Sequence, residues 1–124
     1  MRDLAAEALT ALRTYIQRGR LAIDAFEQDE DNEADRLMKL RKAAFANFKV
    51  FEHKLSQRQI DINAIPEVQS LVADSFEIDE QLEKSIYSYR DRLNEKLNLM
   101  LRNRTRLSKY YSGRSVSSGF ENSA

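Results

Sequence analysis

The stretch from Glu67 to Tyr111 reads EVQSLVADSFEIDEQLEKSIYSYRDRLNEKLNLMLRNRTRLSKYY and contains neither glycine nor proline. Its apolar residues recur at steps of three, four or seven, which places them on one face of an α-helix. That face comprises Leu71, Ile78, Leu82, Ile86, Tyr89, Leu93, Leu97 and Met100. Such a helix would be roughly 65 Å long at about 1.5 Å per residue. A compact domain of this size has a radius of gyration of only about 14 Å, so we expect part of the helix to extend beyond the fold around it.

The composition favours a single all-helical domain. The chain has 124 residues, of which 42% are apolar and 32% charged, with only three glycines and one proline. Strand-rich domains need many turn residues, and these are scarce here. The absence of cysteine excludes disulfides and cysteine–metal sites.

A first helix is predicted over residues 3–27. Its apolar stripe comprises Leu9, Leu12, Ile16, Ile23 and Phe26. Gly19 lies on the same stripe, where a glycine costs about 1 kcal/mol relative to alanine. Either it lets a neighbouring helix approach closely, or it is a tolerated surface glycine.

A second helix is predicted over residues 33–59, after the acidic run Glu27–Glu33. Asn32 is the expected N-cap, and Asp29 or Asp31 would serve nearly as well. The acidic run lacks the central glycine and terminal glutamate of an EF-hand loop, so we expect no metal there. The apolar face of this helix comprises Leu37, Leu40, Ala44, Phe48, Phe51 and Leu55.

The break at residues 60–66 ends in Pro66, which fits the first turn of a third helix predicted over residues 66–111. Short connections make neighbouring helices antiparallel. We therefore expect residues 1–111 to form an elongated antiparallel bundle of three helices with a long C-terminal helix. Gly113 is placed to end that helix, and the small, polar residues 112–124 are expected to form a flexible tail.

The difference in helix length predicts a partner-binding surface. The first two helices, each roughly 40 Å long, would cover the third only to about Asn94. Monomeric proteins rarely leave a large apolar patch open without a use. The predicted partner-binding residues are Phe48, Phe51, Leu93, Leu97, Met100, Leu101, Leu107 and Tyr110. This surface points to a protein that binds another polypeptide.

The predicted surface has a basic rim of Lys96, Arg102, Arg104 and Arg106. The run Arg102–Arg106 looks like a phosphate-contact segment, but the chain has no net charge to attract nucleic acid. A basic rim around an apolar strip also suits an amphipathic partner helix, which we favour. Two alternatives stay open: a second copy covers the strip in a homodimer, or the protein is a nucleic-acid-binding regulator. Acidic residues early in the third helix and basic ones late also suit the helix dipole.

Catalytic chemistry is not expected. His53 is the only histidine, and no glycine-rich phosphate loop, nucleophile elbow or H-E-x-x-H pattern occurs. We therefore expect no enzyme, no cofactor and no metal. Charges near the N-terminus interrupt any signal core, and no stretch approaches the ~18–20 apolar residues of a membrane span. These features predict a cytoplasmic protein without a membrane partner.

Two segments resemble the C-terminal half of FliT-type flagellar export chaperones. They are FEIDEQLEKSIYSYRDRLNEKL at 76–97 and RNRTRLSKYY at 102–111. That family shows an acidic start with spaced Ile and Leu, an Arg-Asp-x-Leu-like centre, and a basic stretch ending in tyrosine. The resemblance covers roughly residues 5–113, and the related FlgN-type chaperones fit nearly as well.

The resemblance implies a small cytoplasmic helical chaperone of flagellar type III secretion. Its client would be an export substrate, for FliT-type members the filament-cap protein, whose C-terminal helical segment is kept soluble and unassembled. Contacts with the export ATPase complex or a flagellar transcriptional regulator are further expectations of the family. Several members carry an extra C-terminal helix over the binding surface, whereas the sequence after Gly113 is short and polar, with Phe120 its one large apolar residue.

Overall fold

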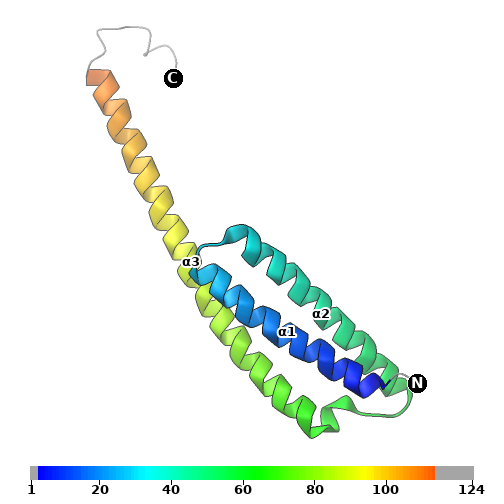
Figure 1. The fold of residues 1–124 in the computed structure, drawn as a ribbon. Coiled ribbons are helices and arrows are strands. Elements are labelled where there is room, and N and C mark those ends of the chain that lie inside the picture. The colour runs from blue at the N-terminus through cyan, green and yellow to red at the C-terminus, as the bar shows by residue number, and fades with distance from the viewer. Residues whose placement is uncertain (1–2, 114–124) are drawn as a thin grey trace. The chain divides into compact units, whose positions relative to one another are not determined.

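The computed structural model describes residues 3–113, and within this range the chain is all-helical and has no strand (Figure 1). Its elements are α1 (Leu4–Glu27), α2 (Asp31–Gln57), the 3₁₀ helix η1 (Ile62–Ala64) and α3 (Pro66–Gly113). The predicted all-helical class is confirmed, and each predicted helix boundary lies within about two residues of the observed one. The predicted tail beyond Gly113 lies outside the described residues.

The chain divides into two compact units, and the boundary falls inside α3. Residues up to Tyr89 form the first unit, and those from Arg90 onward form the second. The first unit holds α1, α2, η1 and the first half of α3. The predicted arrangement as one elongated antiparallel bundle stays a prediction.

Helix α1 is capped at its start by Asp3, and the acidic run at residues 27–33 connects its end to α2. Asp3 accepts a hydrogen bond from the backbone N–H of Ala6 (3.2 Å) and caps the start of α1. After α1, Asp29 adopts a left-handed conformation (φ 56°), which aspartate tolerates better than most residues. The N-cap of α2 is Glu30, which makes no side-chain capping bond. The expected cap at Asn32, Asp29 or Asp31 is therefore wrong, because the helix begins at Asp31 and leaves Asp29 in the turn.

The connection between α2 and α3 is anchored in the core. The Asp61 side chain accepts from the backbone N–H of Asn63 (2.9 Å) and caps η1. Ile62 is only 2% exposed and packs with the core residues Leu55 and Val68. Pro66 then begins α3, as predicted, because its fixed φ and missing N–H suit a first helical turn.

The core of the first unit is built on the small residues of α1. The buried residues of α1 are Leu4, Ala8, Ala11, Leu12, Ile16, Gly19, Ala22 and Ala25. Of the predicted stripe, Leu12 and Ile16 are buried, whereas Leu9 and Ile23 pack only partly buried against the core. The buried face of α1 therefore consists of smaller side chains than predicted. Its alanines let the neighbouring helix come close.

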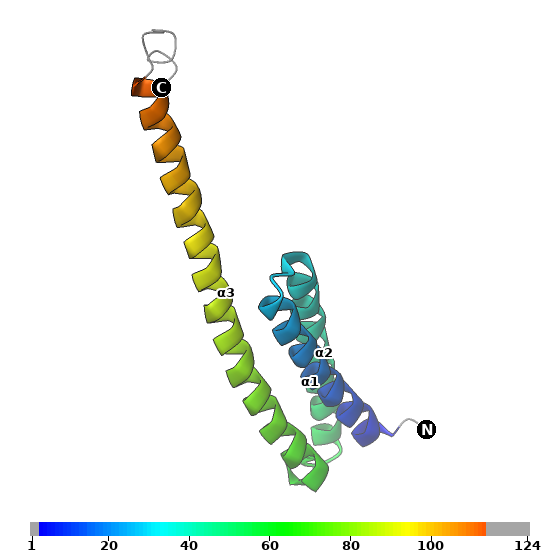
Figure 2. The same ribbon diagram turned by 60° about the vertical axis from the view of Figure 1, so that its left-hand side comes forward.

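Side chains from all three helices meet in two core clusters. Figures 1 and 2 show α1 and α2 side by side. The first cluster joins Leu12 and Ile16 of α1 to Phe48 of α2 and Ile78 of α3, and the second joins alanines of α1 and α2 to Leu82 of α3. Burying a large aliphatic side chain is worth about 1.5–3 kcal/mol, so these clusters hold the first unit together.

Gly19 lies in tight contact with side chains of α2 and α3. A Cβ added there would lie 2.6 Å from Cγ2 of Ile78 and 2.9 Å from Nε of Arg41. Cγ2 of Ile78 is attached directly to its own Cβ and cannot swing away without moving the backbone or changing rotamer. The structure therefore decides between the two readings of Gly19: the glycine allows close helix approach.

We expect Gly19→Ala to lower the free energy of unfolding by about 1–3 kcal/mol, because the added methyl group overpacks the contact with Ile78. Urea unfolding followed by circular dichroism measures the change. Gln17→Ala, at an exposed position of the same helix, serves as the control and should change stability little. A Gly19→Ala variant more stable than the parent would show that the contact yields easily.

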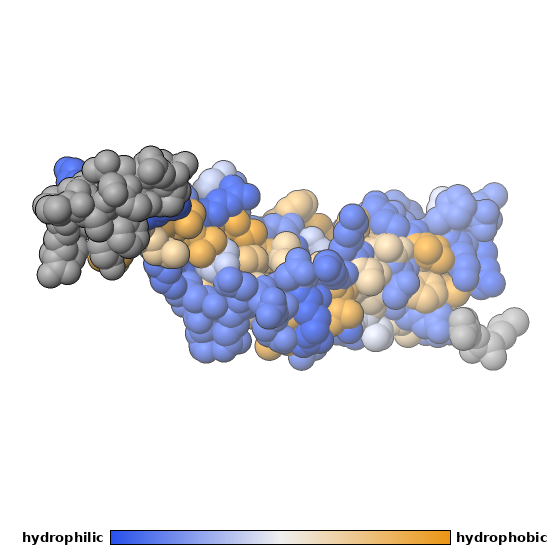
Figure 3. All heavy atoms as spheres, turned by 90° about the horizontal axis from the view of Figure 1, so that it is seen from above, coloured by the Kyte–Doolittle hydropathy of each residue, from blue (hydrophilic) through white to orange (hydrophobic). Residues whose placement is uncertain are grey.

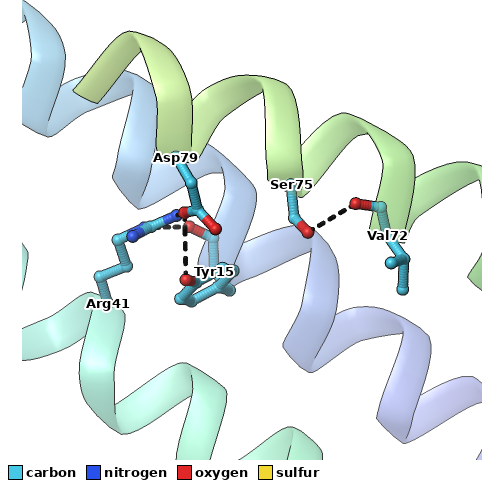
Figure 4. A network of polar contacts seen from close by, with 5 residues as sticks. All are labelled: Tyr15, Arg41, Val72, Ser75 and Asp79. Carbon is cyan, nitrogen blue, oxygen red and sulfur yellow. Dashed lines mark hydrogen bonds and ion pairs between the residues drawn. The ribbon is translucent and has the colours of Figure 1, made fainter. Parts of the chain in front are cut away.

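A polar network links the three helices beside Gly19 (Figure 4). Arg41 of α2 forms a hydrogen-bonded ion pair with Asp79 of α3, and its guanidinium lies 3.8 Å from the centre of the Tyr15 ring. The Tyr15 hydroxyl donates to the same Asp79 carboxylate (3.2 Å). Burial raises the pKa of the Tyr15 phenol; the nearby Arg41 charge opposes this, and Asp79 adds to it. Tyr15 therefore stays a neutral donor.

This ion pair is unequal in its exposure. The Arg41 side chain is 9% exposed and that of Asp79 43% exposed. A buried guanidinium without a counter-charge is costly, whereas a half-exposed carboxylate can be solvated by water. Arg41 therefore depends on Asp79 to stabilise its charge, whereas water can stabilise the charge of Asp79 without Arg41.

Asp79→Asn should lower the free energy of unfolding by about 1–2 kcal/mol, because Arg41 loses its charged partner. The double variant Arg41→Met with Asp79→Asn should recover part of the loss, since no buried cation is then left unpaired. Chemical unfolding of the parent, the single variants Arg41→Met and Asp79→Asn, and the double variant measures the coupling free energy between Arg41 and Asp79. Glu80→Gln is the matched control, because Glu80 pairs with Lys84 only at the surface (3.6 Å). Equal losses for Asp79→Asn and Glu80→Gln would contradict this account.

Candidate protein-binding surface

From Asn94 onward, the described part of α3 is exposed. Every residue from Asn94 to Lys109 is exposed, whereas Leu93 just before them is half-buried. The large apolar side chains among them are Leu97 (54% exposed), Leu99 (57%), Met100 (66%), Leu101 (57%) and Leu107 (55%). The exposure expected from the sequence for this segment is thus found. Figure 3 shows one face of the molecule, on which hydrophobic residues lie open between hydrophilic ones.

The exposed apolar residues fall mainly on one side of α3. Successive residues of an α-helix are separated by about 100°, so steps of three and four return to the same face. Leu93, Leu97, Met100 and Leu107 share such a face, and Leu101 flanks it; we call these five residues the apolar strip. Leu99 lies about 200° from Leu97 around the helix, on the other side. The strip therefore faces one side of α3.

The strip continues the face that α3 buries in the first unit. Val68, Ile78 and Leu82 lie on that face and are 0%, 6% and 3% exposed. The same steps of three and four lead from Leu82 through Ile86 and Tyr89 to Leu93 and Leu97. One helix therefore carries one apolar face, which is covered in its first half and open in its second.

Arg104 occupies a different place from the other predicted rim residues. It follows Met100 by four residues and precedes Leu107 by three, so it lies in line with the strip. Arg102 and Arg106 lie on the opposite side of the helix, and Lys96 lies beside Met100. The residue spacing alone indicates this placement, which differs from the rim predicted for all four bases.

The other predicted partner-binding residues lie elsewhere. Phe48 is 5% exposed and belongs to the first core cluster, and Phe51 packs partly buried against that cluster. Both belong to the first unit, whereas the strip belongs to the second. A groove shared by the two sets stays a prediction. The side chain of Tyr110 lies outside the described residues.

A groove between α1 and α2 was not predicted from the sequence. Its walls include Ala6, Thr10, Ala43 and Ala44, with Phe51 at its edge. The signal for it was the run of small residues on both helices, which the search for large apolar stripes passed over. Its lining includes one acidic residue, Glu7, and one basic residue, Arg18.

A polar hollow lies near the end of α2 and contains the only histidine. His53 Nε2 lies 3.3 Å from Nε2 of Gln57, and Glu52 pairs with Lys49 (3.0 Å). Asp61, on the same hollow, is used as the cap of η1. Among residues 3–113, no three histidine, cysteine or acidic side chains are grouped so that they could hold a metal ion. Of the two acids, Asp61 therefore has a structural role as the cap of η1.

Comparison with models of protein families, with curated proteins and with solved structures found no match for this chain. None of the helices described is both long and apolar enough to cross a membrane. The class that the structure defines is therefore an all-helical protein, and the apolar strip is its main candidate for function.

Proposed function

We propose that this protein is a cytoplasmic export chaperone of the flagellar type III secretion system. It binds a helical segment of an export substrate, the filament-cap protein, and keeps it soluble and unassembled. The proposal rests on the resemblance of residues 76–97 and 102–111 to FliT-type chaperones, with FlgN-type chaperones as the nearest alternative family. In this proposal the protein is a binding protein and not an enzyme, and its three helices form an elongated antiparallel bundle.

The observation that carries the proposal is the exposed apolar strip. Leu97, Met100 and Leu107 are each more than half exposed on one face of α3. A partner helix that covered several of them would gain about 1.5–3 kcal/mol for each side chain fully buried. Helix-in-groove recognition uses this spacing of anchors. The export ATPase complex and a flagellar transcriptional regulator are further partners in this proposal.

Self-association is the second candidate, because the same exposed strip could be covered by another copy of the chain. Sedimentation of the purified protein separates the two: a tight homodimer buries the strip permanently, whereas a monomer leaves it available to a client.

We expect Leu97→Asp to weaken binding of the client by at least about tenfold, since a charge replaces a side chain that the partner buries. Adding Leu101→Asp should abolish binding. The measurement is calorimetric titration with the purified C-terminal helical segment of the filament-cap protein from the same organism. Helicity and melting temperature should stay nearly unchanged, because both side chains are exposed.

Leu99→Asp is the matched control for this experiment. Leu99 is the same residue type, is 57% exposed against 54% for Leu97, and lies on the other side of the helix. It should bind the client with nearly the parent affinity. Equal loss of binding in both variants, or unfolding of the Leu97→Asp variant, would count against the strip as the binding surface.

A further inference from the structure

The positive charge that lies in line with the strip selects the chemistry of its partner. Residues 96–109 carry the bases Lys96, Arg102, Arg104, Arg106 and Lys109 and no acidic residue. The whole chain has no net charge, so this positive segment is local. We propose that the strip binds an amphipathic helix whose apolar face is flanked by acidic side chains. This deepens the proposed function, on which it rests for the identity of the client segment.

The helix dipole does not account for this charge. Its effect is confined to the last turn of a helix. The helix α3 extends to Gly113, so Lys96, Arg102 and Arg104 lie two or more turns before its end. Arg104, which lies in line with the strip, therefore needs another reason to stand on an apolar face.

Arg104 gives the most specific argument. It lies in line with Met100 and Leu107, so a partner that covers these side chains also covers the guanidinium. Removing a guanidinium from water without a counter-charge is costly, whereas a carboxylate can pair with it through two parallel hydrogen bonds. A partner that covers the whole strip should therefore place an acidic residue opposite Arg104.

The same charges disfavour a second copy as the occupant. If the strips of two copies face each other, each copy brings its Arg104 into the interface, and residues 96–109 supply no acid to pair with it. Like charges placed opposite each other across an interface are destabilising. Nucleic acid would neutralise the bases, but it would leave Leu97 and Met100 uncovered. An acidic amphipathic helix satisfies both the charge and the apolar side chains.

Two synthetic peptides test the proposal on the full chain. Both are amphipathic helices with identical leucine positions; one is flanked by glutamate and the other by lysine. Fluorescence anisotropy at ~0.15 M salt should show the glutamate peptide binding at least about tenfold more tightly, a difference of about 1.4 kcal/mol. The ratio should shrink as salt is raised, because exposed charges are screened. Equal affinities for the two peptides would overturn the proposal.

Substitutions at Arg104 test whether this residue is responsible for the preference for the glutamate peptide. Arg104→Glu should remove the preference for the glutamate peptide, and Arg104→Met should reduce it while keeping affinity for the leucine face. Arg20→Glu makes the same change in net charge as Arg104→Glu at an exposed position of α1, and it should keep the preference. If Arg20→Glu lowers the preference as much as Arg104→Glu does, overall charge and not the strip is responsible, and the proposal fails.

Other occupants give distinct results. A concentration-dependent dimer in sedimentation that Leu97→Asp dissociates would identify a second copy and overturn the proposal. Tighter binding of a single-stranded oligonucleotide than of the glutamate peptide, unaffected by Leu97→Asp, would also overturn it.

The client segment separates this inference from the proposed function. If the filament-cap segment binds but the glutamate peptide does not, the acidic preference is wrong and the chaperone function stands. If the glutamate peptide binds but the filament-cap segment does not, the surface is correctly described and the client is wrong.

Discussion

The close contact at Gly19 is the constraint on which the first unit depends. Because a Cβ there would lie 2.6 Å from Cγ2 of Ile78, α1 and α3 can keep their present separation only with glycine at this position. That separation brings Asp79 within reach of both Tyr15 and Arg41. A larger residue at position 19 would therefore disturb the apolar packing and the ion pair together.

The same helix then serves two purposes along its length. The face of α3 that packs Ile78 and Leu82 into the core continues, at the same spacing, into Leu97 and Met100, which are open. The chain contains no other described segment with so many exposed large apolar side chains in succession. The local concentration of positive charge adds chemical selectivity to this surface.

Much of the fold was predictable from helix-breaking residues and from the spacing of apolar residues. Pro66 and the acidic run before α2 mark the helix boundaries because they change the local backbone preference. The small-residue face of α1 was not predicted, because the predicted stripe consisted of large apolar side chains and alanines add little to such a pattern. The role of Arg41 was not predicted either: nothing local distinguishes it from surface bases such as Lys39, yet it is buried. For the candidate site, residue spacing predicted the apolar strip and its basic residues. Phe48 was also predicted to bind the partner, but it lies in the core.

The sequence by itself determined the helical class, the positions of the breaks and the continuous apolar face of α3, because these follow from backbone preferences and from the period of 3.6 residues. The helix lengths predicted that this face becomes exposed at about Asn94, whereas only the tertiary structure decided which side chains of α1 and α2 cover its first half. It also decided that Gly19 is a packing residue and that Arg41 is paired with Asp79. Such contacts join residues far apart in the chain, and no local pattern specifies them.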